Sequence, residues 1–268
     1  MNKQIDHIVF CCNDGYFYPF LTVVYSISKH YNKKRTINFH LLYKCNNISR
    51  LSISIATQFI NSCGHIFTPH EIRRETDFNR TISRITEETF FRYFIAETIP
   101  CKKALYLDAD ILVRKDISSL FEIDISNSLI AGVDDPFIKS IDYLKSNDAF
   151  SEHDNYFNAG VLLINCEKFR SDNLIDKIVS TSLKYQDTFE YQDQDVLNHA
   201  CWPEITWLNE SYNLTSASFG KKYSKIKDPH IVHWTGPNKP WDAKCERTIF
   251  RVEYAQDYKE TVNKLIKL

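Results

Sequence analysis

The order of apolar patterns at the start of the chain limits the fold to a narrow class. Residues 5–12 form an apolar run bounded by the turn Asn13-Asp14-Gly15, residues 20–31 place apolar side chains at helical spacing, and residues 37–43 alternate like a strand. A strand, a helix and a second strand in this order predict a right-handed parallel crossover. We therefore expect an open α/β sheet, in which ligands bind where the strands end.

Two carboxylates stand at the end of a later apolar strand. Residues 104–107 predict a buried strand that leads directly into Asp108 and Asp110. Period-2 geometry puts both side chains on one side of the strand, where like charges are costly to desolvate unless a divalent cation lies between them. A strand followed by an Asx-rich turn is the alternative explanation of the same residues.

Other predicted strand ends also carry polar side chains. Asp134, Asn158 and His233 lie at such ends, and Gly236 and Lys239 follow in a loop. Together they suit one crevice at the carboxyl edge of a sheet. Two carboxylates and an imidazole, with a diphosphate completing the shell, suit Mn²⁺ or Mg²⁺, and the histidine favours manganese. Taken alone, a histidine at a strand end is more often structural.

The remaining segments predict one continuous domain. The sequence Gln-Asp-Gln-Asp at 192–195 precedes an apolar helical turn and, taken alone, reads as a helix cap. Residues 69–81 are expected to form a mobile surface loop and residues 139–155 a polar loop. Further strands are predicted at 65–68, 129–133, 156–165, 202–208 and 230–234, helices at 51–60, 90–99 and 169–185, and an amphipathic tail helix at 246–268 with the stripe Phe250, Tyr254, Tyr258 and Val262.

Composition excludes some partners. The 268 residues carry 33 Lys and Arg against 34 Asp and Glu, so no global basic field attracts nucleic acid. The N-terminus has no signal-peptide pattern and no apolar run approaches the ~18–20 residues of a membrane span. Eight cysteines without a Cys-x-x-Cys pair favour reduced thiols. We expect a cytoplasmic protein with at most peripheral contact to the inner face of the membrane; its oligomeric state stays open.

The order of the motifs is more specific than any one of them. The chain resembles bacterial glycosyltransferase family 8, which includes lipooligosaccharide and lipopolysaccharide α-galactosyltransferases and α-glucosyltransferases and, more distantly, glycogenin. The resemblance rests on residues 10–16, Phe91-Arg92, residues 105–110, Phe157-Asn158-Ala159-Gly160, residues 192–195 and residues 233–241. It implies a single Rossmann-like GT-A domain at 1–245, with a mostly parallel sheet and flanking helices, and a helical tail at 246–268 packed on or near it.

The resemblance also implies roles for individual residues. Asp108, Asp110 and His233 would hold Mn²⁺, with Mg²⁺ as the alternative, against the diphosphate of a UDP-sugar, and Gly236 and Lys239 would contact the same phosphates. The other residues of the implied donor site are Cys11, Asn13, Asp14 and Tyr16, of which the last three lie near uridine, and Arg92, Asp134, Asn158, Ala159, Asp193 and Gln194, near the sugar. Asn13 departs from the aspartate that the family's galactosyltransferases often have there.

The family retains the anomeric configuration of the sugar. The resemblance implies a catalytic group of Arg92, Asp193, Gln194 and Asp195, with Gln194 beneath the anomeric carbon. An amide is a poor nucleophile, so we favour front-face transfer, in which the leaving phosphate helps to deprotonate the acceptor. Asp195 as a rearranged nucleophile is the alternative.

The leading hypothesis is a hexosyltransferase that uses UDP-galactose or UDP-glucose and a glycan or glycolipid acceptor such as lipopolysaccharide core. A glycogenin-like enzyme that glucosylates itself, or one that glycosylates proteins, would share the fold. A metal-dependent phosphohydrolase would also need clustered aspartates, but one Asp-x-Asp with one histidine argues against a two-metal site.

Overall fold

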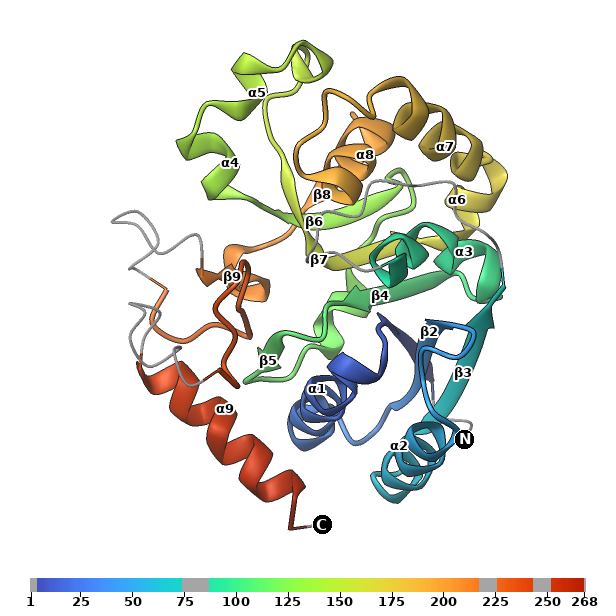
Figure 1. Cartoon of the computed structure of the whole chain (residues 1–268), viewed down its shortest axis with the longest axis vertical. Coiled ribbons are helices and arrows are strands. Elements are labelled where there is room, and N and C mark those ends of the chain that lie inside the picture. Colours follow the sequence, from blue (N-terminus) through green and yellow to red (C-terminus); the bar gives the residue numbers. More distant parts are fainter. Residues whose placement is uncertain (1–3, 74–86, 217–225, 243–251, 268) are drawn as a thin grey trace.

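A seven-stranded sheet of order β3-β2-β1-β4-β7-β6-β8 runs through the centre of the protein (Figure 1). The computed structural model describes residues 4–73, 87–216, 226–242 and 252–267. Neighbouring strands are parallel except that β7 runs antiparallel to β4 and β6, which confirms the mostly parallel sheet. The strands are β1 (Ile5–Cys11), β2 (Thr36–Lys44), β3 (Ile66–Ile72), β4 (Lys103–Leu107), β6 (Ile130–Asp134), β7 (Phe157–Asn165) and β8 (Ile205–Trp207).

Apolar side chains cover both faces of this sheet, because consecutive residues of a strand point to opposite faces. Phe10 and Leu105 pack on one side with α1 and α2, whereas Val9 and Tyr106 pack on the other side with the remaining helices of the core. The helices of the first face are α1 (Phe17–His30) and α2 (Arg50–Ser62); those of the second are η2 (Glu87–Phe94), α3 (Ile95–Thr98), α6 (Cys166–Ser171), α7 (Leu174–Lys184) and α8 (Gln192–Cys201). The result is a three-layer α/β domain.

The order of strands creates a switch point beside β1. The chain passes from β1 through α1 to β2 and through α2 to β3 on one side, and β4 lies on the other side of β1. Connections that leave in opposite directions open a crevice beyond the carboxyl ends of the two strands. Cys11 and Asp108 stand at these two ends.

A small second sheet and the tail helix lie beside the main sheet. This sheet has the order β5 (Ile111–Val113), β10 (Ile231–His233) and β9 (Leu214–Thr215). Helix α9 (Val252–Leu265) contacts α1 and buries Tyr254 and Tyr258 against Trp234 (Figure 1). Val262 is partly buried there, while Phe250 and the expected 245/246 boundary lie outside the described residues.

Three predicted segments differ from the structure. Residues 69–72 belong to β3, where Pro69 is tolerated because β3 is an edge strand; residues 74–81 of that expected loop lie outside the described residues. The helix expected at 90–99 is mostly the 3₁₀ helix η2, because residues 90–96 are all buried and no solvent-facing stripe selects a 3.6-residue period.

The polar loop expected at 139–155 contains short helices instead. They are α4 (Pro136–Ser140), α5 (Tyr143–Ser146) and η4 (Asp148–Phe150). The side chains of Asp135 and Asn147 cap α4 and η4, so the polar residues that indicated a loop act as helix starts. In the part of the chain that the structure describes, no helix is long and apolar enough to cross a membrane.

Candidate functional site

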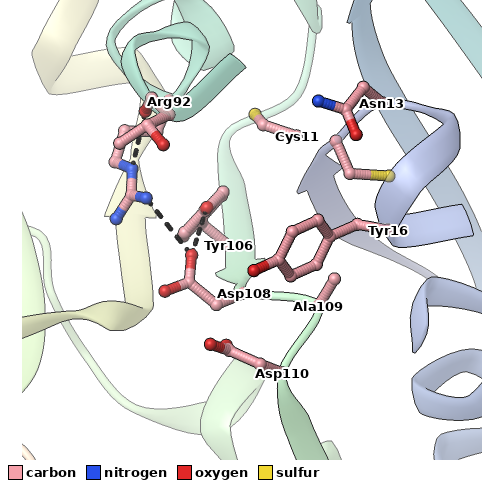
Figure 2. Close-up of a pocket in the computed structure, with 10 residues that line it drawn as sticks. Cys11, Asn13, Tyr16, Arg92, Tyr106, Asp108, Ala109 and Asp110 are labelled. Atoms are coloured by element: carbon pink, nitrogen blue, oxygen red, sulfur yellow. Dashed lines mark hydrogen bonds and ion pairs between the residues drawn. The ribbon is translucent and has the colours of Figure 1, made fainter. Parts of the chain in front are cut away.

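A pocket opens at the switch point between β1 and β4 (Figure 2). Asp108 and Asp110 form one wall, and Tyr16 points into the pocket from the opposite side. Of the predicted donor-site residues, the pocket is lined by Cys11, Asn13, Tyr16 and Arg92 together with the two aspartates.

Asp108, Asp110 and His233 come together as the sequence predicts. One ligand atom from each lies within 4.8 Å of the other two. The turn after β4 supplies the aspartates, and the antiparallel pairing of β10 with β5 brings His233 opposite Ile111. His233 Nε2 lies 3.2 Å from Asp110 Oδ1 and 3.7 Å from Asp108 Oδ2.

The surroundings of this triad fit a divalent cation. Asp110 Oδ1 is buried and accepts no hydrogen bond from the described residues, although it faces an imidazole. Gly160 makes room for the cluster, since a Cβ there would lie 2.2 Å from His233 Cε1 and 2.8 Å from Asp108 Oδ2. Two carboxylates with one imidazole are the donor set expected for Mn²⁺, with Mg²⁺ as the alternative.

Asp108 is held from the side away from His233. Tyr106 donates a hydrogen bond to its Oδ1 atom, and Arg92 Nη2 lies 3.2 Å from the same oxygen (Figure 2). Arg92 also donates to the backbone oxygen of Ala159 at 2.7 Å and pairs with Asp193 at 3.2 Å. These contacts leave Asp108 Oδ2 directed at the cluster.

Lys239 closes the other side of the cluster. Its ammonium donates to Asp110 Oδ2 at 2.5 Å and to the backbone oxygen of Trp234 at 2.8 Å. Burial disfavours the charged ammonium, but Asp110 outweighs it and raises the pKa of Lys239. Gly236, with φ of +82°, supplies the left-handed turn that returns the loop to the pocket.

Two buried carboxyl groups beside Arg92 and Asn158 bind protons more readily than usual. Burial raises the pKa of Asp193 to about 6, although Arg92 opposes this shift. Burial also raises the pKa of Asp135, against its hydrogen bond from Asn158. The Cys11 thiol has its pKa raised well above the usual value by burial, so it is a neutral wall residue.

The buried Asn158 and Asp135 form a hydrogen-bonded cluster with the partly buried Gln194. Gln194 Oε1 accepts from Ala159 N at 2.9 Å and from Asn158 Nδ2 at 3.1 Å. Asn158 Nδ2 also donates to Asp135 Oδ2 at 3.2 Å. The Gln194 amide is therefore pinned with its oxygen toward β7.

Asp134 is the last residue of β6, and its side chain is partly buried. Lys139 pairs with its Oδ2 atom at 3.0 Å and also donates to Asn155 at 2.6 Å. Asp134 Oδ1 is buried and has no hydrogen-bond partner among the described residues. A buried acceptor of this kind normally has a hydrogen-bond partner.

Asp195 is fully engaged by its neighbours. Its two oxygens accept hydrogen bonds from Tyr143 Oη at 2.8 Å, Tyr156 Oη at 2.7 Å and the backbone N–H of Tyr191 at 2.7 Å. The side chain is completely buried. These contacts support a structural position at the start of α8.

The predicted uridine residues separate in the structure. Asn13 accepts from Gly15 N at 3.0 Å and borders the pocket. Asp14 does not line this pocket, because its carboxylate accepts from Ser49 N and Ser52 Oγ.

Several residues of the site were not predicted. Tyr106 is two residues before Asp108, so strand alternation placed it on the same face, whereas Asp135 was hidden behind the neighbouring Asp134. Gly160 belongs to one of the motifs that carry the family resemblance, but no role was predicted for it. Asn213, which contacts His233, lies in a loop segment that carried no sequence signal.

The fold and the site define a glycosyltransferase with the GT-A fold. The structure matches that of the galactosyltransferase LgtC in complex with donor and acceptor sugar analogues, with a TM-score of 0.85, 25% identity, and coverage of 96% of this chain and 95% of LgtC. The chain belongs to glycosyl transferase family 8, whose model matches residues 7–245.

Other relatives agree with this assignment. A putative glycosyltransferase of Haemophilus influenzae is 34% identical over 252 residues, which cover 91% of this chain and 75% of that protein. The crystal structure of the glycosyltransferase GlyE of Streptococcus pneumoniae shares the fold, with a TM-score of 0.73, 23% identity, and coverage of 99% of this chain and 64% of GlyE.

Proposed function

We propose that this protein is a Mn²⁺-dependent, retaining hexosyltransferase that moves galactose or glucose from a UDP-sugar to a surface-glycan acceptor such as lipopolysaccharide core. The observation that carries the proposal is the cluster of Asp108, Asp110 and His233 beside Lys239 at the sheet's switch point. The similarity to the galactosyltransferase LgtC supports sugar transfer as the reaction.

The charged residues of the pocket have complementary tasks in this reaction. Asp108, Asp110 and His233 would hold Mn²⁺, which when bound stabilises the negative charge of the departing UDP. Lys239 would add a positive charge beside the same diphosphate, and the turn at Gly236 would bring the backbone close to it.

On the sugar side, Asp134, whose Oδ1 atom has no hydrogen-bond partner among the described residues, would accept a donor hydroxyl. Asp193, oriented by Arg92, would accept another one. Each of these carboxylates is positioned by a cation before the donor arrives, which lowers the cost of ordering the site.

Front-face transfer fits the groups around the anomeric carbon better than a covalent intermediate does. Gln194 is an amide whose oxygen already accepts two hydrogen bonds, and Asp195 is buried with both oxygens engaged. In the front-face reaction the bond to the UDP oxygen breaks, the acceptor oxygen bonds to the same face of the sugar, and the acceptor proton passes to the leaving phosphate.

We further propose that the enzyme works in the cytoplasm and meets a lipid-linked acceptor through peripheral contact at most. All seven described cysteines are free thiols, including Cys101 and Cys166, whose sulfurs lie 3.8 Å apart. A reducing compartment keeps such a pair unoxidised.

The proposal is tested by a donor screen that measures UDP release from several UDP-sugars, with and without Mn²⁺ and an acceptor. We expect one UDP-hexose to be turned over, with Mn²⁺ required, and Asp110→Asn to lose at least ~100-fold in rate. Turnover that persists without any divalent cation, or phosphate release from nucleotides in place of sugar transfer, would contradict the proposal. A mass increase of the protein itself on incubation with UDP-glucose would indicate self-glycosylation.

A further inference from the structure

A buried chain of hydrogen bonds leads from His233 to the amide cluster on the sugar side. His233 Nδ1 lies 3.0 Å from Asn213 Oδ1, and Asn213 Nδ2 donates to Asn158 Oδ1 at 2.9 Å. The exposed fractions are 3% for His233, 3% for Asn213 and 7% for Asn158, so bulk water does not compete for these contacts. Among the described residues, Asn213 thus links the imidazole to the sugar-side amides.

The direction of this chain is set by groups that can act in only one way. The backbone N–H of Gly160 can only donate, and it donates to Asn158 Oδ1 at 3.1 Å. On the other end of the same amide, Asn158 Nδ2 faces the carboxylate of Asp135 and the oxygen of Gln194, whose own orientation is fixed by Ala159 N. The oxygen of Asn158 must therefore face Asn213.

The same logic continues to the imidazole. Because Asn158 presents an oxygen, Asn213 must present its NH₂ group there and its own oxygen to His233. A neutral imidazole facing an oxygen at 3.0 Å must carry its proton on Nδ1. Nε2 is then left with a lone pair directed toward Asp108 and Asp110.

We infer that Asn213 is a positioning residue that fixes the tautomer of His233 and so prepares Nε2 to bind the metal. The inference rests on the proposed function in so far as it assigns a metal to the triad. Hydrogen-bond partners of ligating histidines commonly act in this way. The link through Asn158 also ties the orientation of His233 to the residues proposed to surround the donor sugar.

The other tautomer of His233, with the proton on Nε2, would interfere with metal binding. If the proton were on Nε2, that N–H would be 3.2 Å from the unpartnered Asp110 Oδ1, and a hydrogen bond between them would occupy both ligand atoms. Asn213 opposes this outcome by offering an acceptor only to Nδ1.

The first test reads the tautomer directly in metal-free protein labelled with ¹⁵N-histidine, at a pH at which the ¹⁵N shifts themselves show a neutral ring. The His233 signals are identified by their loss in His233→Asn. We expect Nδ1 to carry the proton in the wild type and in Asn213→Asp, which keeps the acceptor, and the Nε2–H form to be populated in Asn213→Ala. A wild-type His233 protonated on Nε2, or an unchanged tautomer in Asn213→Ala, would overturn the inference.

The second test measures Mn²⁺ binding alone, by electron paramagnetic resonance of the free ion. Asn213→Ala is expected to bind Mn²⁺ about 10- to 100-fold more weakly. Asn213→Asp should bind Mn²⁺ within a few-fold of the wild type but raise KM for the UDP-sugar, because its second oxygen faces Asn158 Oδ1. Equal Mn²⁺ affinity of Asn213→Ala and the wild type would count against the inference.

The control is Asn165→Ala, which removes another buried asparagine that bonds only backbone groups, the carbonyls of Ile125 and Ser128 and the N–H of Lys168. It should lower stability without altering the His233 signals or Mn²⁺ affinity; an effect on Mn²⁺ equal to that of Asn213→Ala would show a merely structural role. The tautomer measurement needs no donor, so a wild type that turns over no UDP-sugar would refute the proposed function and leave this inference to its own result.

Discussion

At the scale of single residues, the proposed metal site depends on a glycine. Gly160 lies on β7 directly against the triad, and its backbone conformation is ordinary strand. The position requires glycine because of space and not because of backbone angles. A methyl group there would meet His233 Cε1 at 2.2 Å, and neither the ring nor the strand can move without breaking its hydrogen bonds.

We therefore expect Gly160→Ala to displace His233 and weaken Mn²⁺ binding by at least ~10-fold, as measured by titration of the metal alone. The matched control is Gly132→Ala, also in a buried strand, where a Cβ would lie 3.0 Å from Phe157 Cβ. It should lower stability and leave Mn²⁺ affinity unchanged. Wild-type affinity in Gly160→Ala would show that the triad does not hold the ion as described.

The protonation of Asp193 is expected to make the activity depend on pH. Its pKa is raised to about 6, mainly by burial, with Arg92 lowering it and Asp108 and Asp195 raising it further. The proposed role needs the anion, so kcat/KM at saturating Mn²⁺ should rise as the pH passes through about 6. In Asp193→Asn this limb should be absent and activity low throughout. The same limb in Asp193→Asn would assign it to another group.

The raised pKa of Asp193 changes stability with pH in the opposite direction from activity. The folded protein holds the Asp193 proton more tightly than the unfolded chain, whose pKa is near the ordinary value of 3.8. The stabilisation is therefore complete below that value and is lost as the pH rises through about 6. At neutral pH the ionised Asp193 therefore has the form that the proposed donor contact needs, but it no longer provides this stabilisation.

At the scale of elements, the start of α8 is organised by Asp195. One carboxylate joins this helix to Tyr143 on α5 and Tyr156 before β7. The helix start carries Asp193 and Gln194 toward the pocket side, so the position of both depends on this anchor. The contacts explain a buried carboxylate without giving it a nucleophilic role.

Asp195→Ala should lower the free energy of unfolding by more than about 2 kcal/mol, because it leaves buried hydroxyl groups and a backbone N–H unpaired. Urea denaturation measures the loss, and Asp154→Ala at an exposed site is the control. A variant with unchanged stability but no turnover would instead point to a chemical role for Asp195.

Apolar runs and apolar periodicity were sufficient to predict the main elements. Strands β1, β4, β6 and β7 were predicted from continuous apolar runs, and helices α1, α2 and α7 from apolar residues spaced by three to four. The 3₁₀ helix η2 and the short helices α4 and α5 were not, because wholly buried or very short segments have no face for periodicity to reveal.

At the scale of the whole molecule, the tail helix supports the loop that carries Lys239. Tyr258 on α9 packs edge-on against Trp234, with ring centroids 5.6 Å apart, and Trp234 directly follows His233. Its backbone oxygen accepts from Lys239. Helix α9 is thus far from these residues in sequence, but it packs beside the segment that carries His233 and Lys239.

Tyr258→Ala should lower the free energy of unfolding by about 3–5 kcal/mol, the range for removing a buried aromatic ring. Urea denaturation of the full chain is the measurement. Tyr18, which is 71% exposed, provides the control, and Tyr18→Ala should stay within about 0.5 kcal/mol of the wild type. Similar values for the two variants would show that α9 adds no core.

The fold brings together the residues that were predicted from the sequence to bind the metal and the phosphates. Asp108 and Asp110 were predicted from their spacing at the end of a strand, and His233 and Lys239 from the ordered motif that contains them. Asn213 could not be found in this way, because its role comes from a contact across two sheets and a side-chain direction that neighbouring residues impose.

The central claim is that Asp108, Asp110 and His233 hold the metal that faces the UDP-sugar diphosphate. Crystals grown with Mn²⁺ and UDP, with anomalous data collected above the manganese absorption edge, test it most directly. The account predicts one dominant peak bounded by these three side chains, with diphosphate oxygens completing its coordination. A dominant manganese peak elsewhere, or UDP bound at the pocket with no metal at the triad, would contradict it.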